Sequence, residues 1–103
     1  MRIDVDVMEY LKEYHAKEAD ALKSRDMGVL FNLTNREVRN LVSKLRQDGV
    51  PICSSNNGYW YSEDAEDITR TIKRLADQVQ NMRLVIKGLS KAKEAITNAE
   101  KEE

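Results

Sequence analysis

The sequence is poor in the residues that build disulfide scaffolds, metal centres and nucleophilic active sites. Its 103 residues include one cysteine and one histidine, so it can form neither an internal disulfide nor a complete zinc ligand set. No paired nucleophile and base stands out either. One proline and four glycines exclude collagen-like, proline-rich and glycine-rich chains. We therefore expect no catalytic residue, no metal and no cofactor.

Long hydrophobic runs are absent as well. No apolar stretch approaches the roughly 18 residues of a membrane-spanning helix. Residues 1–6 alternate acidic and hydrophobic side chains and lack the apolar core of a secretion signal. Together with the single cysteine, these features predict a cytoplasmic protein with no membrane partner.

Charge is plentiful but unevenly distributed. Charged residues make up 34% of the chain, and the net charge is −1. Within residues 23–46, however, six basic side chains face two acidic ones, a local excess of four positive charges. An anionic partner is therefore expected to dock on this segment.

Residues 1–23 predict a helix followed by a connection. Asp6 is placed to cap a helix over residues 7–15, where apolar residues recur at helical spacing. Residues 16–23 have only a weak apolar stripe. They are interpreted as a connection that ends in a short extended piece around Ala21 and Leu22.

A helix-turn-helix pattern follows. Ser24 is predicted to cap a short helix over residues 25–31. Thr34 and Glu37 have the spacing of a capping box at the start of a second helix over residues 34–48. Two helices joined by about three residues, the second with a strong cap, are typical of helix-turn-helix motifs.

The next ten residues change from helical to strand character. Two β-prone runs, residues 52–54 and 59–61, flank a turn that contains an Asn-Gly pair, a strong hairpin signal. A hairpin directly after a helix-turn-helix is the wing of a winged-helix domain. Cys53 and Trp60 fall on the two strands, where core packing explains them better than redox chemistry or base stacking.

The remaining residues predict one long helix, capped by Ser62 and continuing to about residue 99. Its apolar residues repeat at spacings of four and three, which is the pattern of a coiled-coil seam. The predicted oligomerisation residues are Ile68, Ile72, Leu75, Val79, Met82, Ile86, Leu89 and Ile96. The predicted domains are therefore a winged unit over residues 1–62 and an oligomerisation helix over residues 63–103.

A seam of this length needs a partner helix, and the nearest candidate is a second copy of the chain. From Ile68 to Leu89 it spans about 32 Å at 1.5 Å per residue, which is long for a domain of this size to cover. β-branched residues at the first heptad position favour a parallel pair. Antiparallel pairing and a four-helix assembly remain open, because the flanking positions are almost uncharged.

The helix over residues 34–48 carries a polar face opposite its apolar one. The face consists of Asn35, Arg36, Arg39, Asn40, Ser43, Lys44 and Gln47. Arginine can pair with guanine, and asparagine or glutamine with adenine, in the major groove of DNA. A solvated helix face explains the same spacing taken alone. The preceding capped helix and the following hairpin favour contact with DNA.

Residues 24–61 resemble the winged helix-turn-helix domains at the amino terminus of biotin-protein-ligase repressors and of DeoR-type regulators. The resemblance rests on three stretches, namely Thr34-Asn35-Arg36-Glu37-Val38-Arg39, Leu45-Arg46-Gln47-Asp48-Gly49-Val50-Pro51-Ile52 and Gly58-Tyr59-Trp60-Tyr61. The chain is also similar to small winged-helix proteins of phages and prophages of Gram-positive bacteria. The long terminal helix stands where that family has an effector or enzyme domain.

The resemblance implies how DNA would be bound. The recognition helix enters the major groove, and the wing contacts the backbone or the minor groove. By position, the residues so implied are Asn35, Arg36, Arg39, Asn40, Ser43 and Lys44 on the helix, with Ser54, Ser55, Asn56 and Asn57 on the wing. Further phosphate contacts are expected from Lys23, Arg25 and Arg46, in addition to Lys44.

These patterns predict a mainly α fold with a small β-hairpin wing, a winged helix-turn-helix followed by a long coiled-coil helix. The predicted function is sequence-specific binding of double-stranded DNA by a dimer or higher oligomer, with transcriptional repression as the expected use. The alternative is a protein–protein adaptor, or a phage replication or packaging component, that docks through its winged domain.

Overall fold

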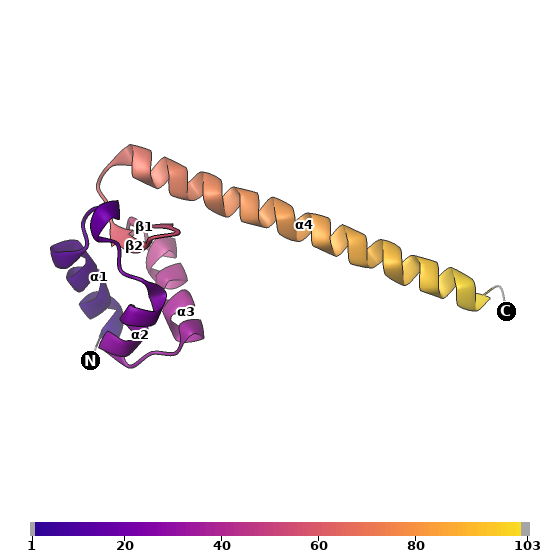
Figure 1. Ribbon diagram of the computed structural model, residues 1–103, viewed down its shortest axis with the longest axis horizontal. Helices are drawn as coiled ribbons and strands as arrows, with labels where there is room; N and C mark the ends of the chain where they lie inside the picture. Colours follow the sequence, from indigo (N-terminus) through magenta and orange to yellow (C-terminus); the bar gives the residue numbers. More distant parts are fainter. Residues whose placement is uncertain (1, 102–103) are drawn as a thin grey trace. The chain divides into compact units, whose positions relative to one another are not determined.

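The computed structural model describes residues 2–101 (Figure 1). In chain order its elements are α1 (Ile3–Tyr14), the 3₁₀ helix η1 (Glu18–Asp20), α2 (Ser24–Phe31), α3 (Asn35–Gln47), β1 (Ile52–Ser55), β2 (Gly58–Tyr61) and α4 (Ala65–Lys101). The predicted class, mainly α with a small hairpin and a long carboxy-terminal helix, is confirmed. The chain divides into two compact units, of which the first ends at Thr71 and the second begins at Ile72.

The first helix begins at Ile3, four residues earlier than predicted. The prediction that Asp6 caps it is wrong, because Asp6 lies inside the helix and its amide donates to the Arg2 carbonyl at 3.1 Å. Ile3 extends the apolar stripe of Val7 and Leu11 by one turn and packs against the core, which favours the earlier start.

The connection after α1 ends in the extended piece that the sequence predicts. Leu22 forms an isolated antiparallel bridge with Tyr59, and both backbone hydrogen bonds between them measure 2.8 Å. The prediction that Ser24 caps α2 is wrong, because Ser24 is the first helical residue and Lys23 is the extended residue before it. The bridge holds Leu22 extended, so the chain turns into the helix immediately afterwards.

The capping box at the start of α3 is confirmed. The Thr34 hydroxyl accepts from the Glu37 amide at 3.2 Å, and the Glu37 carboxylate accepts from the Thr34 amide at 3.0 Å. These hydrogen bonds hold the pKa of the Glu37 carboxyl below its usual value. At the other end, Gly49 has a φ of 89°, the left-handed conformation that commonly terminates helices.

The hairpin is also confirmed, with Ile52 opposite Tyr61 and Ser55 opposite Gly58. Gly58 begins β2 with a φ of 122°, a backbone conformation that residues other than glycine rarely adopt. A Cβ atom there would lie 2.5 Å from the Leu22 carbonyl oxygen. The bridge to Leu22 can therefore form only because residue 58 has no side chain.

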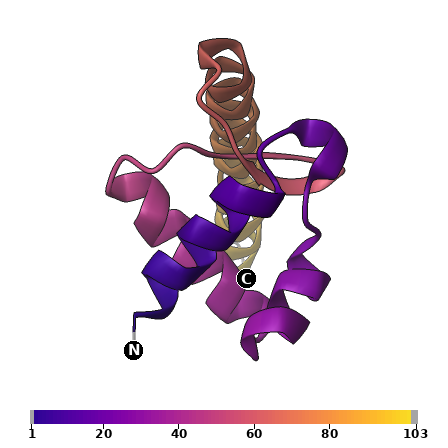
Figure 2. The ribbon, with the colours of Figure 1, turned by 90° about the vertical axis from the view of Figure 1, so that its left-hand side faces the viewer.

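The core of the first unit lies between α1, α2, α3 and the hairpin (Figure 2). Each helix contributes the apolar face that its periodicity predicts, and the hairpin closes one end. The most deeply buried side chains are Val7, Leu11, Met27, Val38, Val42, Cys53 and Trp60.

α4 is capped by Asp64 rather than by Ser62 as predicted. Asp64 Oδ1 accepts from the Glu66 amide at 2.9 Å. Ser62 is buried, and its hydroxyl donates to Asp67 Oδ2 at 2.8 Å. The serine is therefore used to hold the first turn of α4 against the hairpin, and the helix begins two residues later than its capping preference suggests.

Two further contacts tie the beginning of α4 to the hairpin. The Trp60 indole Nε1 donates to Asp67 Oδ2 at 3.2 Å, and the Ser54 amide donates to the Thr71 hydroxyl at 3.3 Å. Thr71 is buried. The first unit consequently includes the first two turns of α4, beyond the boundary predicted after Ser62.

Replacing Asp67 with alanine is expected to lower the free energy of unfolding by about 2 kcal/mol, because the Ser62 hydroxyl and the Trp60 indole lose a shared acceptor. Hydrogen bonds from Ser62, Trp60 and Arg70 hold the pKa of the Asp67 carboxyl below its usual 3.8. Such a carboxylate stabilises the fold above its unfolded pKa, and the contribution disappears as the pH falls through the folded value.

Urea unfolding of parent and Asp67→Ala at several pH values checks this prediction. The difference in unfolding free energy should be complete at neutral pH and should shrink below the usual carboxyl pKa of 3.8. A difference that does not change with pH would contradict an ionic role for Asp67.

Candidate nucleic-acid interface

The polar face of α3 is exposed along its whole length. Its opposite side, Val38, Val42 and Leu45, is buried in the core. This burial fixes the rotation of the helix and so determines which side chains face solvent. The exposed side chains are Asn35, Arg36, Arg39, Asn40, Ser43, Lys44 and Gln47, as predicted from their spacing.

The arginines of this face have no acidic partner within the first unit or elsewhere in residues 2–101. Neither Arg36 nor Arg39 forms an ion pair with a described carboxylate, and both side chains are exposed. Next to them, Gln47 Nε2 donates to Ser43 Oγ at 3.1 Å. The face therefore presents two guanidinium groups whose planar donors match guanine or phosphate acceptors.

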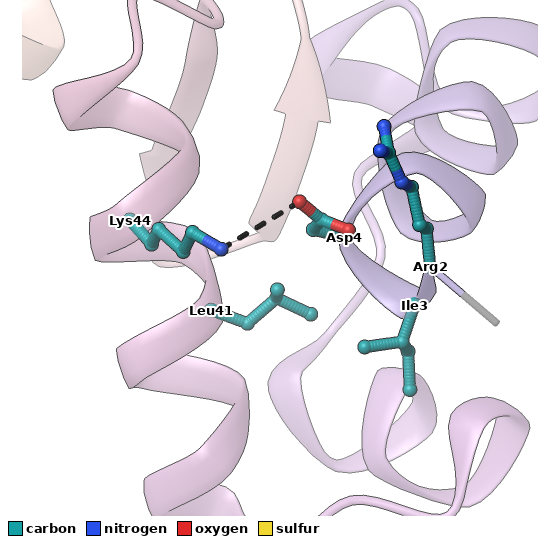
Figure 3. A pocket seen from close by; sticks show the side chains of 5 residues that line it. All are labelled: Arg2, Ile3, Asp4, Leu41 and Lys44. Atoms are coloured by element: carbon teal, nitrogen blue, oxygen red, sulfur yellow. Dashed lines mark ion pairs between the residues drawn. The ribbon is translucent and has the colours of Figure 1, made fainter.

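Lys44 borders a shallow hollow between α3 and the amino end of α1 (Figure 3). Its amino group lies 3.8 Å from Asp4 Oδ2, and Arg2, Ile3 and Leu41 complete the lining. The Lys44 side chain is 66% exposed, so this ion pair is weak. The Lys44 amino group therefore remains largely accessible to solvent beside Asp4. The sequence gives no sign of Asp4, because its pattern places the start of α1 four residues too late.

The tip of the hairpin lies beside the amino end of α2. Lys23 Nζ donates to the Asn56 carbonyl at 3.2 Å, which brings Lys23, Asn56 and Asn57 together. Arg25 is exposed on α2 and forms no ion pair with a described carboxylate. Lys23 and the hairpin tip thus form a second polar cluster, distinct from the α3 face.

Arg46 has an internal role that the sequence analysis did not predict. Its Nε donates to the Ile52 carbonyl at 2.7 Å and its Nη2 to Ser54 Oγ at 2.9 Å. The guanidinium carbon also lies 5.9 Å from the centre of the Tyr59 ring. Arg46 therefore fastens the hairpin to α3, whereas we expected it to contact phosphate. Helical spacing alone gives no sign of this, because Ile52, Ser54 and Tyr59 belong to the hairpin strands.

The predicted oligomerisation residues divide between the two units. Ile68 is half-buried in the first unit, whereas those from Ile72 onward are exposed. In the second unit Ile86 is 62% and Leu89 is 67% exposed. Val85 is also exposed and widens the apolar stripe beyond the two heptad positions. The second unit thus presents a long apolar surface that the described chain leaves uncovered.

The remaining reactive side chains are placed in structural roles. Cys53 is buried, and burial raises the pKa of its thiol, which keeps it protonated and unreactive at neutral pH. The His15 imidazole contacts the Asp20 carbonyl near the end of α1. Across residues 2–101, no helix combines the length and apolar character needed to cross a bilayer.

Comparison with known proteins yields no relative: no family model, no curated protein and no solved structure matches the chain.

Proposed function

We propose that this chain is a winged helix-turn-helix protein that binds double-stranded DNA in a sequence-specific manner and regulates transcription. The observation that carries the proposal is the α3 face, where Arg36, Arg39 and Asn40 are exposed opposite a fully buried apolar side. Helices of this type enter the major groove and contact base edges with arginine and asparagine.

The order of the elements supports the same proposal. A helix, a single bridging residue, two further helices and a hairpin follow one another, and the bridging residue pairs with the second strand of the hairpin. In such an arrangement α2 and α3 form the helix-turn-helix and the hairpin is the wing. The capping box and Arg46 fix the two ends of α3, so that its polar face is presented by a rigid element.

Phosphate contacts supply affinity in this mechanism. Three exposed cationic side chains are available for this role. Lys44 lies beside α1, and Lys23 and Arg25 lie at the amino end of α2. Such contacts release counterions and make binding strongly dependent on salt, while they add no sequence preference.

A second copy of the chain is the proposed partner for the apolar seam of α4. Pairing would remove Ile72, Val79 and Ile86, together with the other seam residues, from water. Two copies present two α3 helices, so the expected binding site consists of two half-sites.

Selection from random-sequence duplexes with the purified full chain tests the proposal directly. We expect enrichment of a motif with two-fold symmetry. Retention of duplexes without enrichment of any motif would overturn the proposal, and failure to retain any duplex at low salt would favour the adaptor function instead.

Two substitutions on α3 should affect DNA binding in different ways. Arg39→Ala is expected to cost about 1–3 kcal/mol of discrimination at one base pair of the selected motif. Lys44→Ala should instead weaken binding to all sequences and lower the slope of log affinity against log salt by about one. Fluorescence anisotropy on the selected and single-mismatch duplexes measures both effects.

Lys17→Ala is the matched control for this pair, because Lys17 is exposed and lies outside residues 23–46. It should bind like the parent. If Arg39→Ala and Lys44→Ala also bind like the parent, α3 is not the recognition helix.

A further inference from the structure

The second unit has a strongly positive segment that the proposed function does not use. Residues 73–93 contain six basic side chains and one acidic side chain. The first unit, residues 1–71, carries ten basic and thirteen acidic side chains and is therefore net negative. The positive charge of the chain outside residues 23–46 is thus concentrated on α4.

Four of these cations share one side of the helix. At 100° per residue, Lys73, Arg83, Lys87 and Lys91 fall within an arc of about 80°, which we call the basic face. The apolar seam is centred about 120° away, so the three lysines of the basic face remain in water when a second copy covers the seam, whereas Arg83 lies at its flank. All four side chains are exposed in the structure.

The basic face is almost free of competing carboxylates. Its single ion pair among the described residues joins Lys73 Nζ to Asp77 Oδ2 at 3.0 Å, with both side chains largely exposed. Such a surface pair contributes little to stability. Arg83, Lys87 and Lys91 form no ion pair with any described carboxylate.

The spacing of these cations fits an extended polyanion. From Lys73 to Lys91 the helix rises about 27 Å at 1.5 Å per residue, which equals the axial length of about eight base pairs of duplex DNA. Three of the four are lysines, which act as point charges on phosphate and lack the planar fork that recognises a base edge.

We propose that the basic face of α4 binds the phosphate backbone of double-stranded DNA without reading its sequence. The proposal rests on the proposed function only in taking DNA as the polyanion. It adds a second contact region, on a different element, that raises affinity for all DNA while α3 determines which sequence is preferred.

An anionic lipid surface is the competing occupant, and the sequence favours DNA. Helices that lie in a membrane interface usually carry aromatic residues on the apolar side. No aromatic residue follows Tyr61, and the seam keeps the spacing of a coiled coil.

The test compares two double variants of the full chain, Lys87→Gln with Lys91→Gln and, as a control, Lys12→Gln with Lys17→Gln. Both remove two positive charges, but the control charges lie on or just after α1. Affinity for a random-sequence duplex is measured by anisotropy across a series of salt concentrations. Sedimentation equilibrium of each variant confirms that assembly is unchanged.

For the α4 variant, the slope of log affinity against log salt should fall by about two, and affinity at 0.1 M salt should fall more than tenfold. The selected motif and the ranking of its mismatches should stay the same. A slope equal to that of the parent and the control would overturn the inference, even if a motif is selected.

If the proposed function fails while the basic face binds DNA, the experiments give a different result. No motif is then selected, but random DNA still binds and the α4 variant still loses affinity. The last measurement is binding of the parent and both variants to vesicles that contain phosphatidylserine. Binding to these vesicles that depends on Lys87 and Lys91, without any change in DNA binding, would also overturn the inference.

Discussion

Gly58→Ala should lower the free energy of unfolding of the first unit by about 3 kcal/mol. The added Cβ would lie 2.5 Å from the Leu22 carbonyl oxygen and 2.9 Å from the Lys23 amide nitrogen, and both are backbone atoms that side-chain rotation cannot move. The φ of 122° at Gly58 adds backbone strain. The loss is a large fraction of the stability of a small domain, typically about 5–15 kcal/mol.

Chemical denaturation followed by Trp60 fluorescence measures this effect, because Trp60 is buried beside the bridge. Gly88→Ala is the control. Gly88 lies inside α4 with open space around it, so alanine there should leave the first unit unchanged and favour the helix by up to about 1 kcal/mol. A Gly58→Ala variant as stable as the parent would contradict the close packing of β2 against Leu22.

Val79→Asp should dissociate the assembly and weaken DNA binding by roughly 100-fold or more, since linked half-sites gain that much from effective concentration. Val79 is 51% exposed in the described chain and lies in the middle of the seam that we propose to pack against a second copy. A carboxylate at this position would have to lose its water in the paired helices. Sedimentation equilibrium at tens of micromolar reports the oligomeric state.

Asn81→Asp adds the same charge two residues later, on a position that faces away from both the seam and the basic face. It should leave assembly intact. A parent chain that is monomeric at tens of micromolar would contradict the seam as an oligomerisation surface. Cutting the chain after Ser62 is a poor substitute for the point variant, because it also removes Asp67 and Thr71 from the hairpin.

Local signals predicted the fold well where they also decide the structure. The ends of α3 follow from the Thr34–Glu37 capping box and from Gly49, because both are interactions within a few residues. The start of α2 depends on a contact between segments distant in sequence, the bridge from Leu22 to Tyr59. At the start of α4 two local capping residues compete, and because the Ser62 hydroxyl donates to Asp67, Asp64 caps the helix instead.

The same distinction applies to the candidate site. Which side of α3 faces solvent follows from periodicity alone, so Arg36 and Arg39 were placed from the sequence. The contacts of Arg46 cannot be predicted in this way, because Ile52 and Ser54 contact it only when the hairpin packs on α3. A long cationic side chain can extend into solvent or pack against the protein, and its position along a helix does not distinguish the two.

The burial of Cys53 makes the native chain suitable for site-directed labelling. It is the sole cysteine, it is 1% exposed, and its thiol is held in the protonated form. A cysteine introduced on the surface of α3 or α4 would therefore be the preferred attachment point for a fluorophore or a cross-linker. Slow modification of Cys53 itself would then measure how often β1 opens, because the thiol becomes accessible only when that strand separates from the core.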